Sequence, residues 1–272
     1  MVERRIYNPK GISLIEIIAA LAILATVAAI SLSGIFSQLN AARERATILD
    51  MKELHRAIVG NPELGIFGSL GDMGKLPDTL KDLIVKPAGA PDFNHNHTNR
   101  VGMGWRGPYL NGFSEDDVIR DKWGTPYQYS PTGPNAGQII SAGPDKDINT
   151  TADNIVYPAD GPLKTAGSFL LMVLVNRIAE PCGVTVNIYS TDNGGESATI
   201  LTKTTGVDGS AYPGFFFHDL KHGIHAVKVT HTGTKDGVSY TVVRTVNVGI
   251  GANAQRDYEF RLQTQADAKL KI

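Results

Sequence analysis

The chain has 272 residues, which is enough for two modest hydrophobic cores or one large one. Lys and Arg total 26 against 27 Asp and Glu, and the resulting net charge of -1 excludes the basic surface that nucleic-acid binding requires. The single cysteine, Cys182, excludes an internal disulfide framework and any metal site built from several cysteines.

A long apolar run opens the chain. Ile12 to Phe36 contains one charged residue, Glu16, and a helix of about 20 apolar residues already crosses a bilayer. Arg4, Arg5 and Lys10 precede the run, so the positive-inside tendency places the first ten residues in the cytoplasm and the bulk of the chain outside it. We therefore expect a membrane helix and an exported remainder.

The acidic residue inside this run calls for a partner. An ordinary secretory signal, with an apolar stretch of roughly 7 to 15 residues, and a plain uncleaved anchor are the alternatives, but neither explains Glu16. A carboxylate in an apolar helix is costly and is normally retained for a partner. If a leader is removed after Gly11, Ile12 gains a charged α-amine that Glu16 of an adjacent subunit can neutralise.

The stretch from Lys10 to Glu16, with the apolar residues Ile17 to Leu32 behind it, resembles the processing site of type IV pilins and type II secretion pseudopilins. The resemblance implies cleavage after Gly11 by a prepilin peptidase and methylation of the new amine. It also implies residence in membrane lipid before assembly, an inner-membrane assembly platform, and a helical filament of identical subunits. Ile12 stands where phenylalanine or methionine is usual in that family.

The helix is expected to continue beyond the membrane to residue 60. Apolar residues recur near helical spacing, and Gly60, Asn61 and Pro62 then supply a stop signal. A surface helix of an unrelated domain is the alternative. The recurring residues are Leu39, Ala42, Ala46, Leu49, Ala57 and Ile58.

Residues 61–162 read as a first globular part. Leu76 to Val85 predicts a short helix, and the aromatic blocks Trp105 to Leu110 and Asp121 to Tyr129 suggest loops anchored against the rod. With Ile139 to Asp153, these blocks resemble the major pseudopilin of type II secretion systems. The resemblance implies a rod packed on a small antiparallel sheet and a calcium ion held by the loop from Ser141 to Ile155.

The chemistry of that loop suits calcium independently of the family. Asp145, Asp147, Asn149 and Asp153 place hard oxygen donors close together, and main-chain carbonyls around Ser141 could supply others toward the 6 to 8 that calcium takes. Asp145 and Asp153 are the strongest candidates. An EF-hand does not fit, because its sixth position would be threonine rather than glycine. A solvated acidic turn is the alternative.

Residues 163–272 extend past the length of a major pseudopilin. Seven alternating or apolar stretches separated by turn clusters predict a β-sandwich. The layout is similar to carboxypeptidase-regulatory-like or transthyretin-like modules, which are usually structural or adhesive. The stretches are Phe169 to Ile178, Val184 to Tyr189, Ala198 to Thr204, Gly214 to Phe217, Ile224 to Thr230, Thr241 to Val248 and Asp257 to Leu262.

Histidines offer two further metal-site hypotheses. His95 and His97 form a His-x-His pair without a visible third ligand, and a mobile polar loop is the preferred interpretation. His225 and His231 fall on one face of a strand, with His218 and His222 nearby, and we interpret them as residues at the rim of the sandwich.

Together these features predict an α+β chain. It comprises a cleaved leader (1–11), an assembly helix (12–60), a pseudopilin domain (61–162) and a β-sandwich module (163–272). The expected function is a structural subunit of a type II secretion pseudopilus or type IV pilus-like filament, stabilised by calcium, on the bacterial inner membrane with periplasmic domains or in an extracellular filament. A surface pilus with an adhesive module and an exported enzyme are the alternatives. The sequence contains no GxSxG, HExxH or Walker motif that would favour an enzyme.

Overall fold

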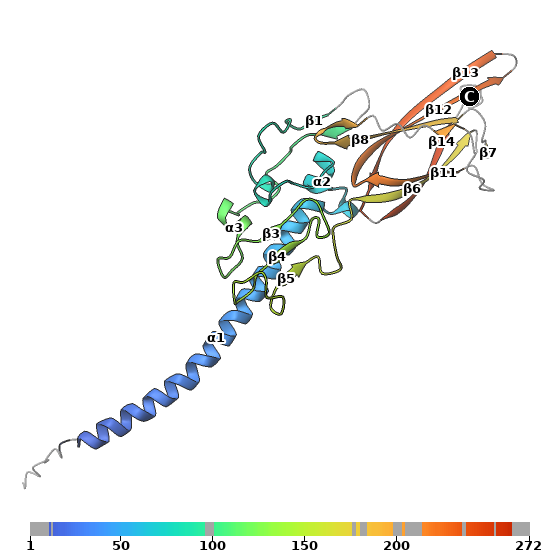
Figure 1. The fold of residues 1–272 in the computed structure, drawn as a ribbon. Coiled ribbons are helices and arrows are strands. Elements are labelled where there is room, and N and C mark those ends of the chain that lie inside the picture. Colours follow the sequence, from blue (N-terminus) through green and yellow to red (C-terminus); the bar gives the residue numbers. More distant parts are fainter. Residues whose placement is uncertain are drawn as a thin grey trace, which may run out of the picture.

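One long helix begins the fold. The computed structural model describes residues 11, 13–95, 101–175, 178–179, 184–197, 203–204, 214–235, 238–252 and 254–262. It describes no side chains for residues 28–33, 174–175, 178–179, 196–197, 203–204, 214, 233–235, 238, 240, 260 and 262. Helix α1, Leu14–Val59, runs from the N-terminal end into the globular part (Figure 1). It ends at Gly60, whose φ of 72° is favourable only for glycine and whose N–H donates to the Arg56 carbonyl.

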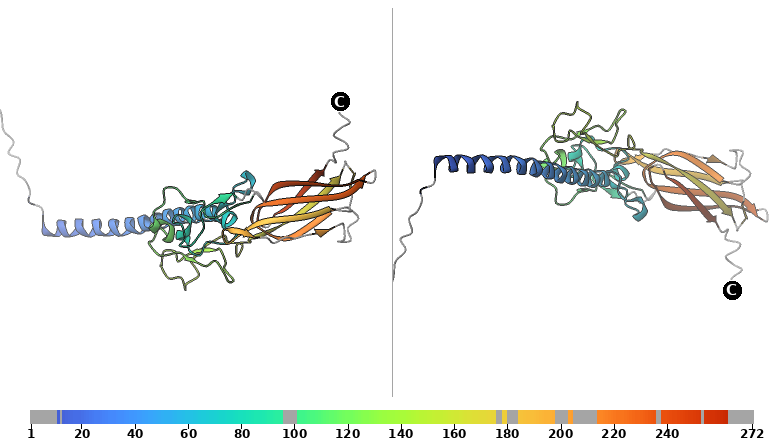
Figure 2. Two further views of the ribbon diagram at one scale, coloured as in Figure 1. Left: turned by 90° about the horizontal axis from the view of Figure 1, so that it is seen from above. Right: turned by 90° about the horizontal axis from the view of Figure 1, so that it is seen from below.

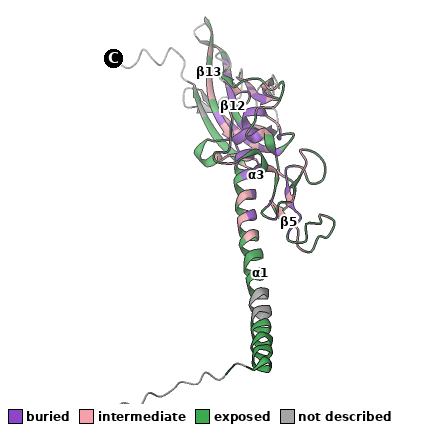
Figure 3. Ribbon diagram, turned by 90° about the vertical axis from the view of Figure 1, so that its left-hand side faces the viewer, coloured by how far each residue is buried: buried purple, intermediate pink, exposed green. Residues whose placement is uncertain are grey.

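The two ends of α1 have different surroundings. Its first turns are exposed, whereas its last turns are buried in the globular part (Figure 3). Met51, Leu54 and Ile58 are fully buried and begin the first hydrophobic core. The remaining members of this core are Ala57, Leu70, Leu76, Leu80, Leu83, Leu110, Val118, Tyr127 and Ile139.

Short elements surround this core. The sheet β3-β4-β5 is antiparallel throughout, and β1 pairs with β2 in a separate antiparallel ladder. The elements are η1 Pro62–Leu64, α2 Gly68–Met73, η2 Leu80–Leu83, β1 Asn94–His95, β2 Gly102–Met103, α3 Glu115–Ile119, β3 Gln128–Tyr129, β4 Ile139–Ser141 and β5 Ile155–Tyr157.

The short helix expected within Leu76 to Val85 is a single 3-10 turn. Thr79 and Asp82 cap it reciprocally, with the Thr79 N–H donating to Asp82 Oδ2 at 2.9 Å. Pro87 follows soon after, and the residue before a proline is disfavoured in the helical region. The expected short helix is therefore present, as a 3-10 helix.

The C-terminal strands form two sheets that enclose a second core. One sheet has the order β10-β8-β12-β13, with β9 paired to β8, and the other has the order β11-β6-β14, with β7 paired to β6. The strands are β6 Ala166–Val175, β7 Ile178–Ala179, β8 Val184–Asp192, β9 Gly195–Ser197, β10 Lys203–Thr204, β11 Gly214–Lys221, β12 Gly223–Lys235, β13 Val238–Ile250 and β14 Gln255–Leu262.

Alternation along the strands builds the second core. In β8, Val184, Val186 and Ile188 are buried while the residues between them are only partly buried, as expected for a half-buried strand. They meet Phe169 and Leu171 of β6 from the facing sheet. The pairing is antiparallel except for β14, which lies parallel to β6.

The α+β class is confirmed, and each of the seven expected stretches contains at least one strand, although most of Ala198 to Thr204 lies outside the described residues. The rod, the first globular part and the sandwich follow one another along a single direction, as two further views show (Figure 2). The β12–β13 hairpin projects away from the rod (Figure 1).

Among the described residues, no helix contains a segment that meets the length and hydropathy needed for a membrane span. Ile12 and the side chains of residues 28–33, which belong to the apolar run of the sequence, fall outside that description. The membrane anchor stays a prediction.

Candidate functional site

The N-terminus of α1 is closed by Glu16 itself. The Ser13 N–H donates to Glu16 Oε2 at 2.9 Å, and the Ser13 hydroxyl accepts from the Ile15 N–H at 3.4 Å, which together make a capping box. Gly11 is exposed, and Ile12 lies outside the described residues. We expect the Glu16 carboxylate to pair with the α-amine of Ile12 in an adjacent subunit. Within its own chain it accepts from the N–H of the next residue, Ser13, and lies at the positive end of the helix dipole.

The exposed part of α1 carries large apolar side chains on several faces. Leu14 is 75% exposed and Ile15 is 73% exposed, although such residues are normally buried in a water-soluble protein. A contiguous apolar surface of this kind marks a site of contact with protein or lipid. The other exposed members are Ile17, Ile18, Leu21, Ile23, Leu24, Val27, Ile35, Phe36 and Leu39.

The aromatic block at residues 121–129 fastens the first globular part to the rod. Trp123 Nε1 donates to Asn40 Oδ1 at 3.3 Å, and the Lys122 N–H donates to Thr47 Oγ1 at 3.2 Å. The Lys122 ammonium also pairs with Asp50 at 2.5 Å. The expected anchoring against the rod is thus observed for this block, whereas Trp105 packs edge-on against Tyr109, with ring centroids 6.0 Å apart.

Ser141 stands at the entrance of the acidic loop and is engaged elsewhere. It is fully buried, and its hydroxyl donates to Asp121 Oδ2 at 2.6 Å. The other oxygen of Asp121 accepts from the Trp123 N–H at 3.0 Å and the Thr125 N–H at 2.9 Å. The Ser141 side chain therefore ties the loop to the rod-binding block, and only its main chain is left for a metal.

Asp145 and Asp153 lie together in the loop. The Asp145 N–H donates to Asp153 Oδ2 at 3.2 Å, and Asp145 itself accepts from the Thr150 hydroxyl and from the Asp147 N–H at 2.8 Å. The hydrogen bond from Thr150, with further ones from the loop, holds the pKa of Asp145 below its ordinary value. Asp145 is therefore ionised at neutral pH, as a cation ligand must be.

Asp147 turns toward Asn149. Its Oδ1 accepts from the Asn149 N–H at 3.0 Å and from the Asn149 side-chain amide at 2.8 Å. The donor chemistry fits calcium, because the loop offers carboxylate and amide oxygens and backbone carbonyls. Within the described residues, however, no three Asp, Glu, His or Cys side chains form a ready-made metal cluster. Binding would require Asp145 and Asp147 to exchange loop donors for the cation.

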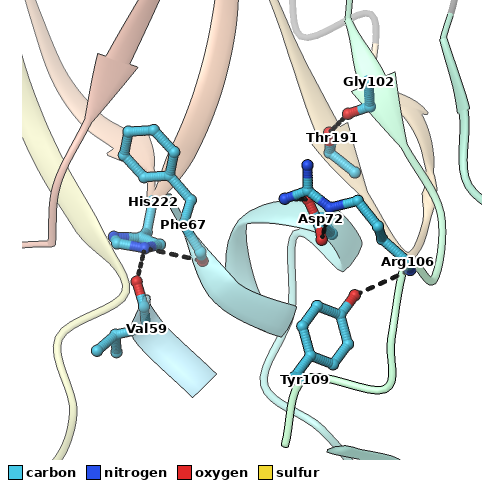
Figure 4. Close-up of polar contacts among 8 residues, drawn as sticks. All are labelled: Val59, Phe67, Asp72, Gly102, Arg106, Tyr109, Thr191 and His222. Carbon is cyan, nitrogen blue, oxygen red and sulfur yellow. Dashed lines mark hydrogen bonds and ion pairs between the residues drawn. The ribbon is translucent and has the colours of Figure 1, made fainter. Parts of the chain in front are cut away.

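His222 joins the sandwich to the end of the rod. Its Nε2 lies 2.8 Å from the carbonyl oxygen of Val59, the last residue of α1, and 3.2 Å from that of Phe67 (Figure 4). Its Nδ1 accepts from the Ala252 N–H at 2.9 Å. These partners require the tautomer with the proton on Nε2, so a sandwich side chain satisfies a carbonyl that the helix end leaves unpaired.

Further close contacts join the two parts of the chain. The Gly194 N–H donates to the Met73 carbonyl at 2.8 Å, and the Thr191 hydroxyl donates to the Gly102 carbonyl at 3.2 Å (Figure 4). A Cβ on Gly74 would lie 2.1 Å from the Thr191 carbonyl oxygen. The two parts of the chain therefore approach closely, and we call this contact, with the His222 bonds, the junction.

An ion pair between half-exposed Arg106 and buried Asp72 supports the first part beside the junction. The Arg106 guanidinium binds both carboxylate oxygens of Asp72 at 3.0 Å, and Asp72 is only 6% exposed (Figure 4). Burial raises the pKa of Asp72, and the Arg106 charge opposes that rise. Arg106 also lies 5.0 Å from the ring centroid of Phe93, a cation–π geometry.

The remaining histidines do not assemble a metal site in the part of the chain that the structure describes. His225 and His231 are buried on β12, which corrects the expectation that they lie at the rim of the sandwich. His218 is exposed and packs edge-on against Phe216, while His95 lies on β1 and its expected partner His97 is outside the described residues.

The junction was not foreseen from the sequence. A lone histidine next to Gly223 in a turn between strands carries no signal of a partner more than 150 residues earlier in the chain. The Gly-rich turns at Gly74 and Gly194 were the only available hint of close approach.

The first globular part and the adjoining section of the rod are similar to a known protein family. A family model described as type II secretion system, protein G, matches residues 34–157. Residues 34–157 are thus similar to the type II secretion protein G family. This pseudopilin family is structural rather than catalytic, which agrees with the expectation that the chain is not an enzyme.

The sandwich has no comparable match. No curated protein matches the sequence. A solved structure of a candidate carbohydrate-binding protein from Pseudomonas aeruginosa is similar at 11% identity over 37% of this chain and 90% of that chain. Its TM-score of 0.22 carries no argument about fold or function.

Proposed function

We propose that this chain is a structural subunit of a type II secretion pseudopilus and assembles with identical copies through α1. The single observation that carries the proposal is the apolar surface of α1, where Leu14, Ile15, Leu21 and other large side chains are exposed in the isolated subunit. The family of residues 34–157 supports the same role. Packing such helices side by side removes this apolar surface from water or exchanges lipid contacts for protein contacts.

Before assembly, the same surface suits membrane lipid. Type II secretion pseudopilins are membrane-associated and periplasmic, and we place α1 of this chain in the inner membrane with both cores on the periplasmic side. The partners in this proposal are the prepilin peptidase, the inner-membrane assembly platform and other copies of the chain.

Leader removal after Gly11 would prepare the subunit for assembly. The new amine of Ile12 would lie beside the Ser13–Glu16 capping box of its own chain or meet Glu16 of a neighbour. An ammonium in an apolar bundle is costly unless it is paired, so this contact would fix the axial register between helices.

Calcium would stiffen the acidic loop. Asp145 and Asp153 are the proposed side-chain ligands, with Asp147 and Asn149 available from the same loop. Because Ser141 connects the loop through Asp121 to the block that grips α1, a stiffer loop would also hold the rod more firmly.

The test compares two equally apolar, exposed leucines. Leu21→Ser on the rod should strongly reduce pseudopilus formation in cells that express the secretion machinery, as counted by negative-stain electron microscopy of sheared material. Leu64→Ser is the control, since Leu64 is 69% exposed but lies outside α1. Equal filament numbers for the two variants would refute assembly through α1, and long surface fibres in wild-type cells would favour a pilus.

A further inference from the structure

A pocket next to the junction has no role in the proposed filament. It encloses about 170 Å³ between α2, the turn at residues 87–91, Trp105 and the β8–β9 turn at Asn193. That volume is below the roughly 300 to 1,000 Å³ of pockets that hold drug-sized ligands, so any occupant is a single small ring rather than a chain.

One buried polar group in the pocket lining, the Ser69 hydroxyl, lacks a partner within the described part of the chain. Ser69 lines the pocket and is 4% exposed, and its hydroxyl makes no hydrogen bond to any described residue. A buried hydroxyl without a partner costs about 1 to 3 kcal/mol, and each such group in a folded protein calls for a ligand, a water or another reason. A ligand hydroxyl could both donate to it and accept from it.

The charged side chains at the pocket already have partners within the chain. The Lys75 ammonium pairs with Asp78 at 3.0 Å, and the Asp82 carboxylate accepts from the Thr79 N–H at 2.9 Å and the Thr79 hydroxyl at 3.0 Å. No charged group in the lining is left without a partner, so a neutral ligand fits better than an ion.

The other walls offer an apolar face and an amide. Trp105 is held in place by its Nε1, which donates to the Asp82 carbonyl at 2.9 Å, and Pro87 and Pro91 continue the apolar wall. Asn193 brings a side-chain amide that donates and accepts from the sandwich side. A sugar ring combines an apolar C–H face with hydroxyl groups at its edge and matches this arrangement.

The pocket is also preformed. Gly194, next to Asn193, donates its N–H to the Met73 carbonyl at 2.8 Å, and a Cβ there would lie 2.8 Å from Pro91 Cγ. The sandwich turn is thereby fixed against the pocket wall, and a ligand need not order it on binding.

We propose that this pocket binds a single neutral sugar ring, with Trp105 against the apolar face of the ring and Ser69 and Asn193 bound to its hydroxyl groups. The proposal does not depend on filament assembly, because every wall comes from one chain.

The test uses the full chain in micelles of a detergent without a sugar headgroup. Trp105 and Trp123 are the two tryptophans of the chain, so the tryptophan fluorescence of the Trp123→Phe variant comes from Trp105 alone. Titration with glucose, galactose and N-acetylglucosamine should give a saturable fluorescence change at millimolar concentration for at least one sugar.

Two variants examine the polar contacts. Ser69→Ala should raise the Kd roughly threefold to tenfold without lowering the melting temperature, since it removes a hydroxyl with no described partner. Asn193→Gly should weaken binding similarly, because it removes the side-chain amide. Glycine readily adopts the φ of 50° found at this position, so the turn should be kept. Asn111→Gly, in an exposed turn outside the lining, is the control and should bind as the background does.

Three results would overturn the proposal. No saturable change with any of the sugars would mean that the pocket holds solvent alone. Binding that persists unchanged in Ser69→Ala and Asn193→Gly would place the sugar elsewhere. Binding of phenol without any sugar would show an apolar ring site instead.

Discussion

Gly11 has open space around it, since a Cβ built there meets no atom within 4 Å. Gly11→Ala should therefore leave the folded chain unchanged and affect only recognition by a peptidase. We expect it to block leader removal, so that mass spectrometry of the protein from cells with the peptidase finds Met1 to Lys10 still attached. Gly34→Ala is the matched control, because a Cβ there also meets nothing within 4 Å, and it should be processed normally.

The Glu16 carboxylate has two candidate roles, and one substitution separates them. Glu16→Gln keeps an oxygen that can accept from the Ser13 N–H but removes the charge. If pairing with the Ile12 amine is essential, the variant should be cleaved normally yet give at least about tenfold fewer filaments, since an unpaired buried charge costs several kcal/mol. Glu44→Gln, at an exposed position of α1, should assemble normally. Wild-type filament numbers for Glu16→Gln would leave Glu16 only its capping role.

Two buried histidines predict that acid loosens the sandwich. Burial lowers the pKa of His222 and lowers that of His225 to about 4, against an ordinary value of 6.5. Between these values the unfolded chain binds more protons than the folded one, so stability is complete above about pH 6.5 and falls as the pH drops. Protonation of His225 alone should lower the free energy of unfolding by about 3 kcal/mol between pH 7 and pH 4.

Urea denaturation measured by circular dichroism at several pH values checks this. The free energy of unfolding of the chain should fall below pH 6.5, and the fall should be shallower in His225→Leu. A flat profile from pH 7 to pH 5 would contradict the neutral, buried state of both side chains.

At the scale of elements, the acidic loop would link the proposed calcium site to the rod. Calcium at 1 mM should raise the melting temperature of the full chain in micelles by several degrees relative to excess chelator, because a ligand at about 100 times its Kd adds about 2.7 kcal/mol. Asp153→Asn should remove most of this shift, since Asp153 bonds Asp145 across the loop. Asp116→Asn, on α3, should keep it. A wild-type chain that melts at one temperature in both conditions would rule out calcium stabilisation.

Local patterns allowed the prediction of elements better than of their partners. The end of α1 at Gly60 follows from a Gly-Asn-Pro stop signal, and the sandwich strands follow from alternation such as Val184, Val186 and Ile188. The parallel pairing of β14 with β6 could not be predicted, because alternation specifies a face but not a neighbour.

The same limit applies to the site residues. Loop ligands such as Asp145 and Asp153 are close in sequence, so their proximity is visible in the spacing. His222 and Val59 are distant in sequence, and their contact depends on how the two parts of the chain meet. The hydrogen bond that commits Ser141 to Asp121 was likewise hidden, because it depends on the position of the rod-binding block.

At the scale of the whole molecule, direct hydrogen bonds join the two cores in addition to the connecting chain. His222 caps α1, and Gly194 and Thr191 bond the first part directly. A subunit built in this way would carry the sandwich in a fixed direction from the rod, so every copy in a filament would present it identically.

Two glycines with matching backbone conformations allow a test of this rigid coupling. Gly65 and Gly74 both end short helices, with φ, ψ of 73°, 18° and 68°, 12°. Alanine costs roughly 1 to 2 kcal/mol in this conformation at either position. At Gly65 a Cβ meets nothing within 4 Å, whereas at Gly74 it would lie 2.1 Å from the Thr191 carbonyl oxygen and push the sandwich away.

Gly65→Ala should therefore lower the melting temperature modestly and leave one cooperative transition. Gly74→Ala should lower the free energy of unfolding by about a further 1 to 3 kcal/mol, because the added Cβ overpacks the junction. The two cores should then unfold in two separate calorimetric transitions. Limited proteolysis should then cut Gly74→Ala, but not Gly65→Ala, between Pro158 and Ala166, where the chain passes from one core to the other. Identical calorimetric profiles for the two variants would mean that the junction does not couple the cores.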